Sequence, residues 1–283
     1  MSSEGVLSLI GLGLGSPKDI TIRGLETIRA ADHVYLENYT SLLVSSSPED
    51  LRVFYDIKNL HVADREFVEN NGAEEMISLA QNSRVCFLVV GDPFCATTHT
   101  DLVLRARAAS VRVEVIHNAS IVSAVGACGL QVYRFGEIIS IPLWQGGWKP
   151  ESFYDKLEAN AKRNLHTLCL LDIKVKEKNL IALARGKEGI YDPPKFMTVI
   201  EALQQLSEIE TSRNSGIVTG KAQVVALARV GREDQVLLSG SVESFLSRAD
   251  EVDSILGGPL HSLVICADSL HELEAEFLES FKL

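Results

Sequence analysis

The stretch "GDPFCATTHTDL", residues 91–102, carries more polar groups than a simple chain reversal needs. It follows the apolar run "VCFLVV", residues 85–90, so Asp92 and His99 come just after an expected buried strand. Open α/β sheets bind ligands beyond the carboxyl ends of their strands. A local alternative exists, in which Asp92 makes an Asx turn and the adjacent threonines cap the next helix. The residue types therefore favour a ligand loop, with a structural turn as the alternative.

A second candidate loop contains Gly11, Gly13 and Gly15, directly after the first apolar run. Glycines there let the backbone approach a phosphate, and a following helix N-terminus favours an anion. Glu37, about 20 residues later, could hold a ribose. However, neither register of the loop completes the G-x-G-x-x-G pattern of dinucleotide-binding folds. A tight turn, a different kind of ligand loop and an NAD site all remain open from these residues alone.

The first 116 residues alternate expected strands with expected helices. Short apolar runs predict strands at 6–12, 33–37, 84–90 and 111–116, and helical spacing predicts helices at 20–32, 63–83 and 97–110. The strands lack an apolar/polar alternation, which indicates burial on both faces. This half therefore predicts a mainly parallel sheet covered by helices on both sides.

The alternation of expected strands and helices is interrupted by the turn-rich segment 133–150, which contains both tryptophans. A second α/β set follows, with expected strands at 166–173, 222–231 and 261–267 and expected helices at 151–164, 197–209 and 269–281. The sequence therefore predicts two α/β domains, residues 1–119 and 120–283.

The bulk composition excludes several classes of protein. A net charge of -11 without a basic cluster argues against nucleic-acid binding. No apolar stretch reaches the roughly 20 residues of a membrane span, and the N-terminus lacks the basic start of a signal peptide. The five cysteines are scattered without a CxxC pair, which argues against a zinc site and against disulfides. We expect a cytoplasmic protein with no metal and no membrane partner.

Several short sequence segments, in a fixed order along the chain, resemble those of a known family. They are "LSLIGLGLGSPKDIT", "VYLENYTS", "ADREFVE", "GDPFCATTHTDL", "HNASI", "LCLLDIKVKE", "ARVG" and "PLHSLVI". Together they resemble the diphthine synthase family, a branch of the tetrapyrrole-methylase-like, class III S-adenosylmethionine-dependent methyltransferases. The resemblance spans essentially the whole chain. The chain length and "IYDPPKFMTV" resemble the eukaryotic rather than the archaeal type.

The resemblance implies a homodimer of two-domain α/β chains, with S-adenosylmethionine in a cleft between the domains. Its cofactor contacts map onto Leu14, Asp92, Cys95, Ser120, Ile121, Leu171, Val230 and His261. Relatives typically have glycine where this chain has Cys95, so the sulfur is expected to narrow the pocket. Without the resemblance, the four aliphatic residues of this set would be assigned to the core.

The resemblance also implies the reaction. The substrate would be elongation factor 2, whose modified histidine carries a 3-amino-3-carboxypropyl group, and the eukaryotic-type features predict four methyl transfers ending in a methyl ester. A catalytic base is not assigned, with His99, Glu37 and Tyr39 as candidates. The alternatives are a trimethylating diphthine synthase, a tetrapyrrole methyltransferase, an NAD-binding oxidoreductase and a non-catalytic binding module.

Overall fold

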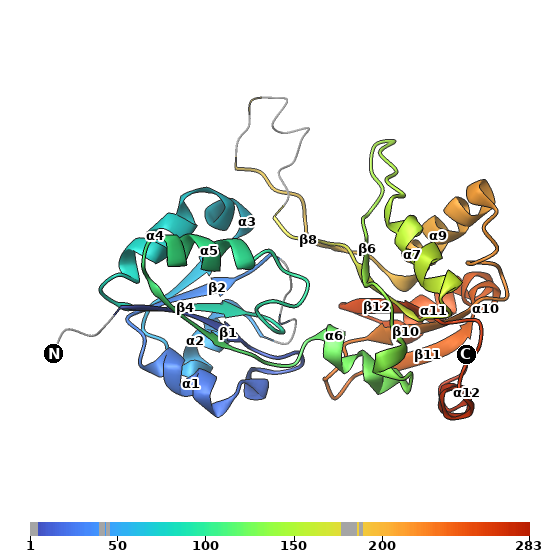
Figure 1. Cartoon of the computed structure of the whole chain (residues 1–283), viewed down its shortest axis with the longest axis horizontal. Coiled ribbons are helices and arrows are strands. Elements are labelled where there is room, and N and C mark those ends of the chain that lie inside the picture. Colours follow the sequence, from blue (N-terminus) through green and yellow to red (C-terminus); the bar gives the residue numbers. More distant parts are fainter. Residues whose placement is uncertain (1–4, 40–42, 44–45, 177–185, 187–188) are drawn as a thin grey trace. The chain divides into compact units, whose positions relative to one another are not determined.

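A computed structural model of the chain describes residues 5–39, 43, 46–176, 186 and 189–283. The chain folds into two compact units (Figure 1). Residues 1–122 and 174–194 form the first unit, and residues 123–173 and 195–283 form the second. Among the described residues, no helix is both long and apolar enough to cross a membrane.

The first unit is built on a parallel five-stranded sheet in the order β3-β2-β4-β1-β5. Its strands are β1 (Val6–Gly11), β2 (His33–Glu37), β3 (Leu60–Ala63), β4 (Arg84–Val89) and β5 (Arg112–Ile116). The four strands expected from the apolar runs are confirmed. The edge strand β3 was not expected, because "LHVA" is short and carries exposed side chains at His61 and Val62.

Helices cover both faces of this sheet, as Figure 1 shows. They are α1 (Ile22–Arg29), α2 (Pro48–Tyr55), α4 (Ala73–Leu79) and α5 (Thr100–Ala108). Successive strand residues point to opposite faces. Phe87 of β4 therefore packs with Met76 and Leu102 of α4 and α5. Its neighbour Leu88 packs with Ile28 and Leu51 of α1 and α2. Both faces of the sheet are thus buried, which explains why its strands read as continuous apolar runs.

The segment expected to be helical, residues 63–83, is helical from Arg65 to Leu79 but does not form one regular α-helix. A short α3 (Arg65–Phe67) leads into a π-helical turn, Val68–Gly72, before α4 begins. A Cβ at Gly72 would lie 2.3 Å from the Phe67 ring, so the glycine leaves room for this ring inside the widened turn. The periodicity of apolar residues shows that the segment is helical, but it does not reveal that one turn contains an extra residue.

The second unit contains a mixed sheet in the order β11-β10-β12-β7-β6. Its strands are β6 (Ile139–Ile141), β7 (Thr167–Leu171), β10 (Gln223–Ala228), β11 (Val236–Ser241) and β12 (His261–Ile265). All neighbours are antiparallel except β6 and β7. Two further short strands, β8 (Ile173–Lys174) and β9 (Lys195–Phe196), form a separate ribbon. The three expected strands of this half are confirmed, whereas β6 and β11 were not expected.

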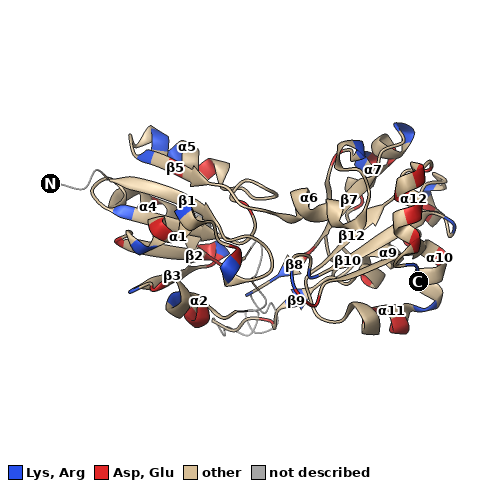
Figure 2. Cartoon of the chain, turned by 90° about the horizontal axis from the view of Figure 1, so that it is seen from below, with Lys and Arg blue, Asp and Glu red and all other residues tan. Residues whose placement is uncertain are grey.

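Helices α7 (Phe153–Lys162), α9 (Val199–Arg213), α10 (Val242–Ser247) and α11 (Ala249–Leu256) cover one face of the mixed sheet. The other face packs against α12 (Glu272–Glu279) and the segment around Cys128. Fully buried Glu274 accepts hydrogen bonds from Arg134 (2.6 Å), His166 (3.2 Å) and two backbone N–H groups, which fixes α12. Acidic and basic residues both occur along the helices of each unit (Figure 2).

Candidate functional site

Three loops meet at the carboxyl edge of the parallel sheet, following β1, β4 and β5. Neighbouring strands β1 and β4 continue into helices on opposite faces, α1 and α5, which makes this edge a topological switch point. Two backbone hydrogen bonds join the first two loops directly. Gly13 N donates to Gly91 O (3.2 Å), and Gly91 N donates to Gly13 O (2.8 Å).

The glycines at this edge have a steric role. Gly13 and Gly91 have φ of +79° and +80°, in the left-handed region that disfavours a Cβ. A Cβ at Gly11 would lie 2.6 Å from Gly91 O. These residues therefore allow the two loops to approach each other, which is a different arrangement from a dinucleotide-binding fingerprint.

Asp92 connects the second loop to the third. Its Oδ1 accepts from Phe94 N (2.9 Å), and its Oδ2 accepts from His117 Nδ1 (2.8 Å) and Asn118 N (3.1 Å). Burial raises the pKa of Asp92, but these hydrogen bonds outweigh burial and hold it below its usual value. The expected Asx turn is present, but the carboxylate also reaches 25 residues along the chain. Three of its roughly four acceptor positions are used.

Asn118 fastens the third loop to the first. Its side-chain nitrogen donates to the carbonyl oxygens of Gly11 and Asp19, both at 3.0 Å. Sequence reasoning did not single out His117 or Asn118. The signals available were their position directly after an expected strand and their place at the start of the segment "HNASI".

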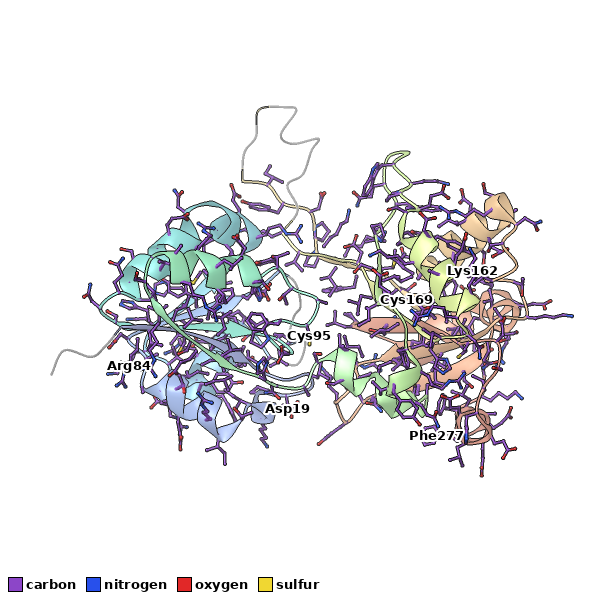
Figure 3. All side chains as sticks on the ribbon, in the orientation of Figure 1. Asp19, Arg84, Cys95, Lys162, Cys169 and Phe277 are labelled. Carbon is purple, nitrogen blue, oxygen red and sulfur yellow. The ribbon has the colours of Figure 1, made fainter. Side chains whose placement is uncertain are left out.

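The polar residues of "GDPFCATTH" close the second loop on itself. Pro93 O accepts from Thr97 Oγ1 (2.6 Å) and from His99 Nδ1 (3.0 Å). Cys95 N donates to Asp92 O (3.3 Å), which completes a β-turn. Cys95 itself is half-buried, on the same side of the unit as Asp19 (Figure 3). The surplus of hydroxyl and imidazole groups thus holds a compact loop at the sheet edge.

The three candidate bases of the sequence lie near one another but are deeply buried. Glu37, Tyr39 and His99 are 1%, 6% and 2% exposed. Tyr39 N donates to Glu37 Oε1 (3.1 Å), and the Tyr39 and His99 rings meet edge to face. Burial lowers the pKa of His99, so its imidazole stays neutral near pH 7. Their burial makes them poor acceptors for a proton from an incoming substrate.

The predicted cofactor residues of the first unit all belong to these loops. Ser120 is 4% exposed and lies beside Gly91, where an added Cβ would be 3.5 Å from Ser120 Cβ. Leu14 and Ile121 are half-buried and follow the first and third loops. With Asp92 and Cys95, they form one group at the carboxyl edge of the sheet.

The remaining three predicted residues gather at one end of the second unit's sheet. Leu171 ends β7, His261 begins β12, and Val230 follows the end of β10. The strand register pairs Ala228 with His261 and Leu170 with Ser262, so residues far apart in the sequence become neighbours. The mixed sheet brings these three together, and the apolar pattern alone could not.

His261 contains a buried polar atom without a partner. Its Nε2 lies 3.2 Å from the carbonyl oxygens of Gly257 and Gly258, so Nε2 carries the proton. Its Nδ1 is then an acceptor, buried and without a hydrogen bond to any described residue. Burial lowers the pKa of His261, which keeps the ring neutral. An unpaired buried acceptor suits a donor group of a bound ligand.

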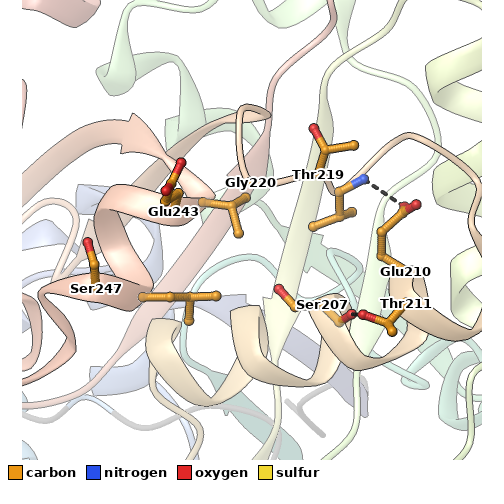
Figure 4. A pocket seen from close by; sticks show the side chains of 10 residues that line it. Ser207, Glu210, Thr211, Thr219, Gly220, Glu243 and Ser247 are labelled. Carbon is orange, nitrogen blue, oxygen red and sulfur yellow. Dashed lines mark hydrogen bonds between the residues drawn. The ribbon is translucent and has the colours of Figure 1, made fainter.

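A separate cavity of about 530 Å³ lies in the second unit between α9 and α10 (Figure 4). Its walls are formed by Ser207, Glu210, Thr211, Val218, Thr219, Gly220, Val242, Glu243, Leu246 and Ser247. The Glu210 carboxylate already accepts hydrogen bonds from the Tyr154 and Ser215 hydroxyls and from three backbone N–H groups. These bonds fix the loop after α9. The eight predicted cofactor residues are absent from these walls. Among the described residues, no cluster of three His, Cys, Asp or Glu side chains could hold a metal ion.

Comparison with known proteins defines the class. Residues 6–246 match the family model of the tetrapyrrole (corrin/porphyrin) methylases. The chain therefore belongs to the tetrapyrrole methylase family.

Several curated relatives within that family carry the same name. The Diphthine methyl ester synthase of Bos taurus is 52% identical over 280 residues, 98% of this chain and 95% of that protein. The protein of the same name from Dictyostelium discoideum is 49% identical and covers 98% of both chains. A solved diphthine synthase structure matches with a TM-score of 0.79 and 32% identity, covering 98% of this chain and 96% of that one. An Entamoeba histolytica structure, described as a candidate diphthine synthase, reaches 0.84 and 38%, covering 99% of each. By sequence, the chain groups with the diphthine methyl ester synthases.

Proposed function

We propose that this chain is an S-adenosylmethionine-dependent methyltransferase of diphthamide biosynthesis. It acts on the 3-amino-3-carboxypropyl-histidine of elongation factor 2 and transfers four methyl groups, the last to the carboxylate. It works in the cytoplasm as a homodimer. The observation that carries this proposal is the full-length identity of about one half to proteins named Diphthine methyl ester synthase.

The residues present fit the proposed cofactor. S-adenosylmethionine supplies a methyl group on a positively charged sulfur, which makes the methyl carbon a strong electrophile. In the first unit, Ser120 and the remaining acceptor position of Asp92 suit its polar groups, and Leu14 and Ile121 offer half-buried apolar surface. In the second unit, the buried Nδ1 of His261 suits a ligand N–H donor.

The chain's own contribution is alignment and exclusion of water. A methyl transfer of this kind needs the accepting atom in line with the breaking bond, so a rigid site lowers the barrier. The loops after β1, β4 and β5 are mutually fixed by hydrogen bonds through Gly13, Gly91, Asp92 and Asn118. Such a preorganised edge can hold a ligand without local rearrangement.

The eukaryotic-type features that predict four transfers lie chiefly in "KEKNLIALARGKEGIYDPPKF", residues 176–196, of which 177–185 and 187–188 lie outside the described residues. The test uses the full chain, labelled S-adenosylmethionine and elongation factor 2 that carries the unmethylated 3-amino-3-carboxypropyl group. We expect label in elongation factor 2 and none in a porphyrinogen offered in parallel. Label in the porphyrinogen alone would contradict the proposal.

A further inference from the structure

Asp92 and His117 form an acid–imidazole pair at the loop edge. The Asp92 side chain is 8% exposed, whereas the His117 side chain is 66% exposed, and Oδ2 lies 2.8 Å from Nδ1. An ionised carboxylate only accepts hydrogen bonds, so Nδ1 must carry the proton. In the neutral ring, Nε2 then holds a lone pair, and it makes no hydrogen bond to any residue the structure describes.

The surroundings fix the direction of this ring. Its Nδ1 is held by a carboxylate that is itself fixed by Phe94 N and Asn118 N. The Phe94 ring packs edge to face against the imidazole, with 6.0 Å between centroids. A buried carboxylate that holds Nδ1–H and leaves Nε2 outward is the arrangement that prepares a histidine to accept protons.

The proposed reaction needs such an acceptor for only some of its steps. The substrate amine is protonated at neutral pH, and it must lose a proton before each of its three methylations. Each time, the amine nitrogen bonds to the methyl carbon as the carbon–sulfur bond breaks and its electron pair stays on sulfur. Three protons leave in total. The fourth transfer, to an anionic carboxylate oxygen, releases none.

Other titratable groups at this edge are less suited to the task. His99, Glu37 and Tyr39 are almost fully buried. Asp19, on the loop after β1, accepts hydrogen bonds from Gly15 N (2.7 Å) and Ser16 N (3.0 Å). The charged group that contacts His117 directly is Asp92, whose depressed pKa keeps it ionised.

We propose that His117 is the general base for the three N-methylations and that Asp92 positions it, an inference that rests on the proposed function. Nε2 takes a proton from the substrate ammonium before each transfer and releases it to solvent. His117 has no part in the esterification step.

The test compares H117N with wild type. The asparagine side-chain nitrogen takes the place of Nδ1–H and keeps the bond to Asp92, but Nε2 is lost. We expect N-methylation of elongation factor 2 near pH 7 to slow about 100-fold. The pH–rate profile of H117N should differ from that of wild type, because the substrate amine must then lose its proton directly to solvent. The calorimetric affinity for S-adenosylmethionine should stay within about threefold, since the loop keeps its hydrogen bonds. H61N, which removes an exposed histidine of β3, is the matched control and should behave as wild type.

Two further measurements separate catalysis from structure. With substrate already trimethylated, H117N should form the methyl ester as fast as wild type. In the free protein, ¹⁵N NMR should show the His117 signal, assigned by its absence in H117N, as the Nδ1–H tautomer at high pH. Equal slowing of N-methylation and esterification, an unchanged pH profile, or the Nε2–H tautomer would overturn the assignment. If wild type itself leaves elongation factor 2 unmethylated, the proposed function fails instead.

Discussion

Replacing Asp92 by alanine should weaken cofactor binding while the protein stays folded. The carboxylate joins two loops through hydrogen bonds to Phe94 N, Asn118 N and His117 Nδ1. Its removal leaves those three donors without their charged partner and frees the β4 and β5 loops from each other. The sheet beneath is unaffected, because its strands and core do not include the Asp92 side chain.

The size of the effect follows from the chemistry of the bonds. A hydrogen bond to a charged group contributes about 1.5–3 kcal/mol. Water can reach the three donors after truncation, because their hydrogen bonds are only partly buried. We therefore expect the free energy of cofactor binding to weaken by the contribution of about one such hydrogen bond, about 1.5–3 kcal/mol. At about 1.4 kcal/mol for each factor of ten, the Kd for S-adenosylmethionine should rise about 10- to 150-fold. The melting temperature should fall by only a few degrees, about 2–4 °C per kcal/mol for a protein of this size.

The assay is a calorimetric titration of D92A with S-adenosylmethionine, together with a thermal melt. D101A is the matched control, because the Asp101 side chain is 72% exposed on α5. It should bind the cofactor like wild type. If D92A melts far below wild type and its folded fraction binds with unchanged affinity, Asp92 is a structural turn residue and the site is misplaced.

Two other predictions concern the loop and the buried histidines. If Cys95 faces the cofactor, C95G should bind S-adenosylmethionine at least as well as wild type and C95W should not bind it. A normal titration with C95W would show that this position faces away. Burial lowers the pKa values of His99, His166 and His261, so the unfolded chain, with histidine pKa values near about 6.5, binds protons first as the pH falls. Chemical denaturation should therefore give a free energy of unfolding that decreases below about pH 6.5. A constant or rising value between about pH 7 and about pH 5 would contradict this.

The sequence predicts the first unit well because burial on both faces of a parallel sheet leaves a strong local pattern. The apolar runs at β1, β2, β4 and β5 mark their own strands. The exposed edge strand β3 lacks that pattern, since two of its four residues face solvent. In the mixed sheet, β6 has three residues and β11 contains Ser239 and Gly240, so neither resembles a strand locally.

At the candidate site, too, contacts between residues close in the sequence could be predicted better than contacts between distant residues. In the sequence, the polar residues of "GDPFCATTH" favour a ligand loop, whereas in the structure Thr97 and His99 hydrogen-bond to Pro93 O, within six positions along the chain. The importance of His117 depends on its contact with Asp92, 25 positions earlier, and on exposure that no local pattern records. Conversely, His99 looks like a base in the sequence, and only the fold reveals how deeply it is buried.

The most direct test of the central claim is the mass of the reaction product. The full chain is incubated with excess S-adenosylmethionine and elongation factor 2 carrying the unmethylated 3-amino-3-carboxypropyl-histidine. The modified peptide is then analysed by mass spectrometry at mildly acidic pH, which preserves an ester. Our account predicts four added methyl groups, one of them released by mild base. A product that stops at three methyl groups with cofactor in excess would contradict the ester-forming activity, and an unmodified peptide would contradict the proposed function as a whole.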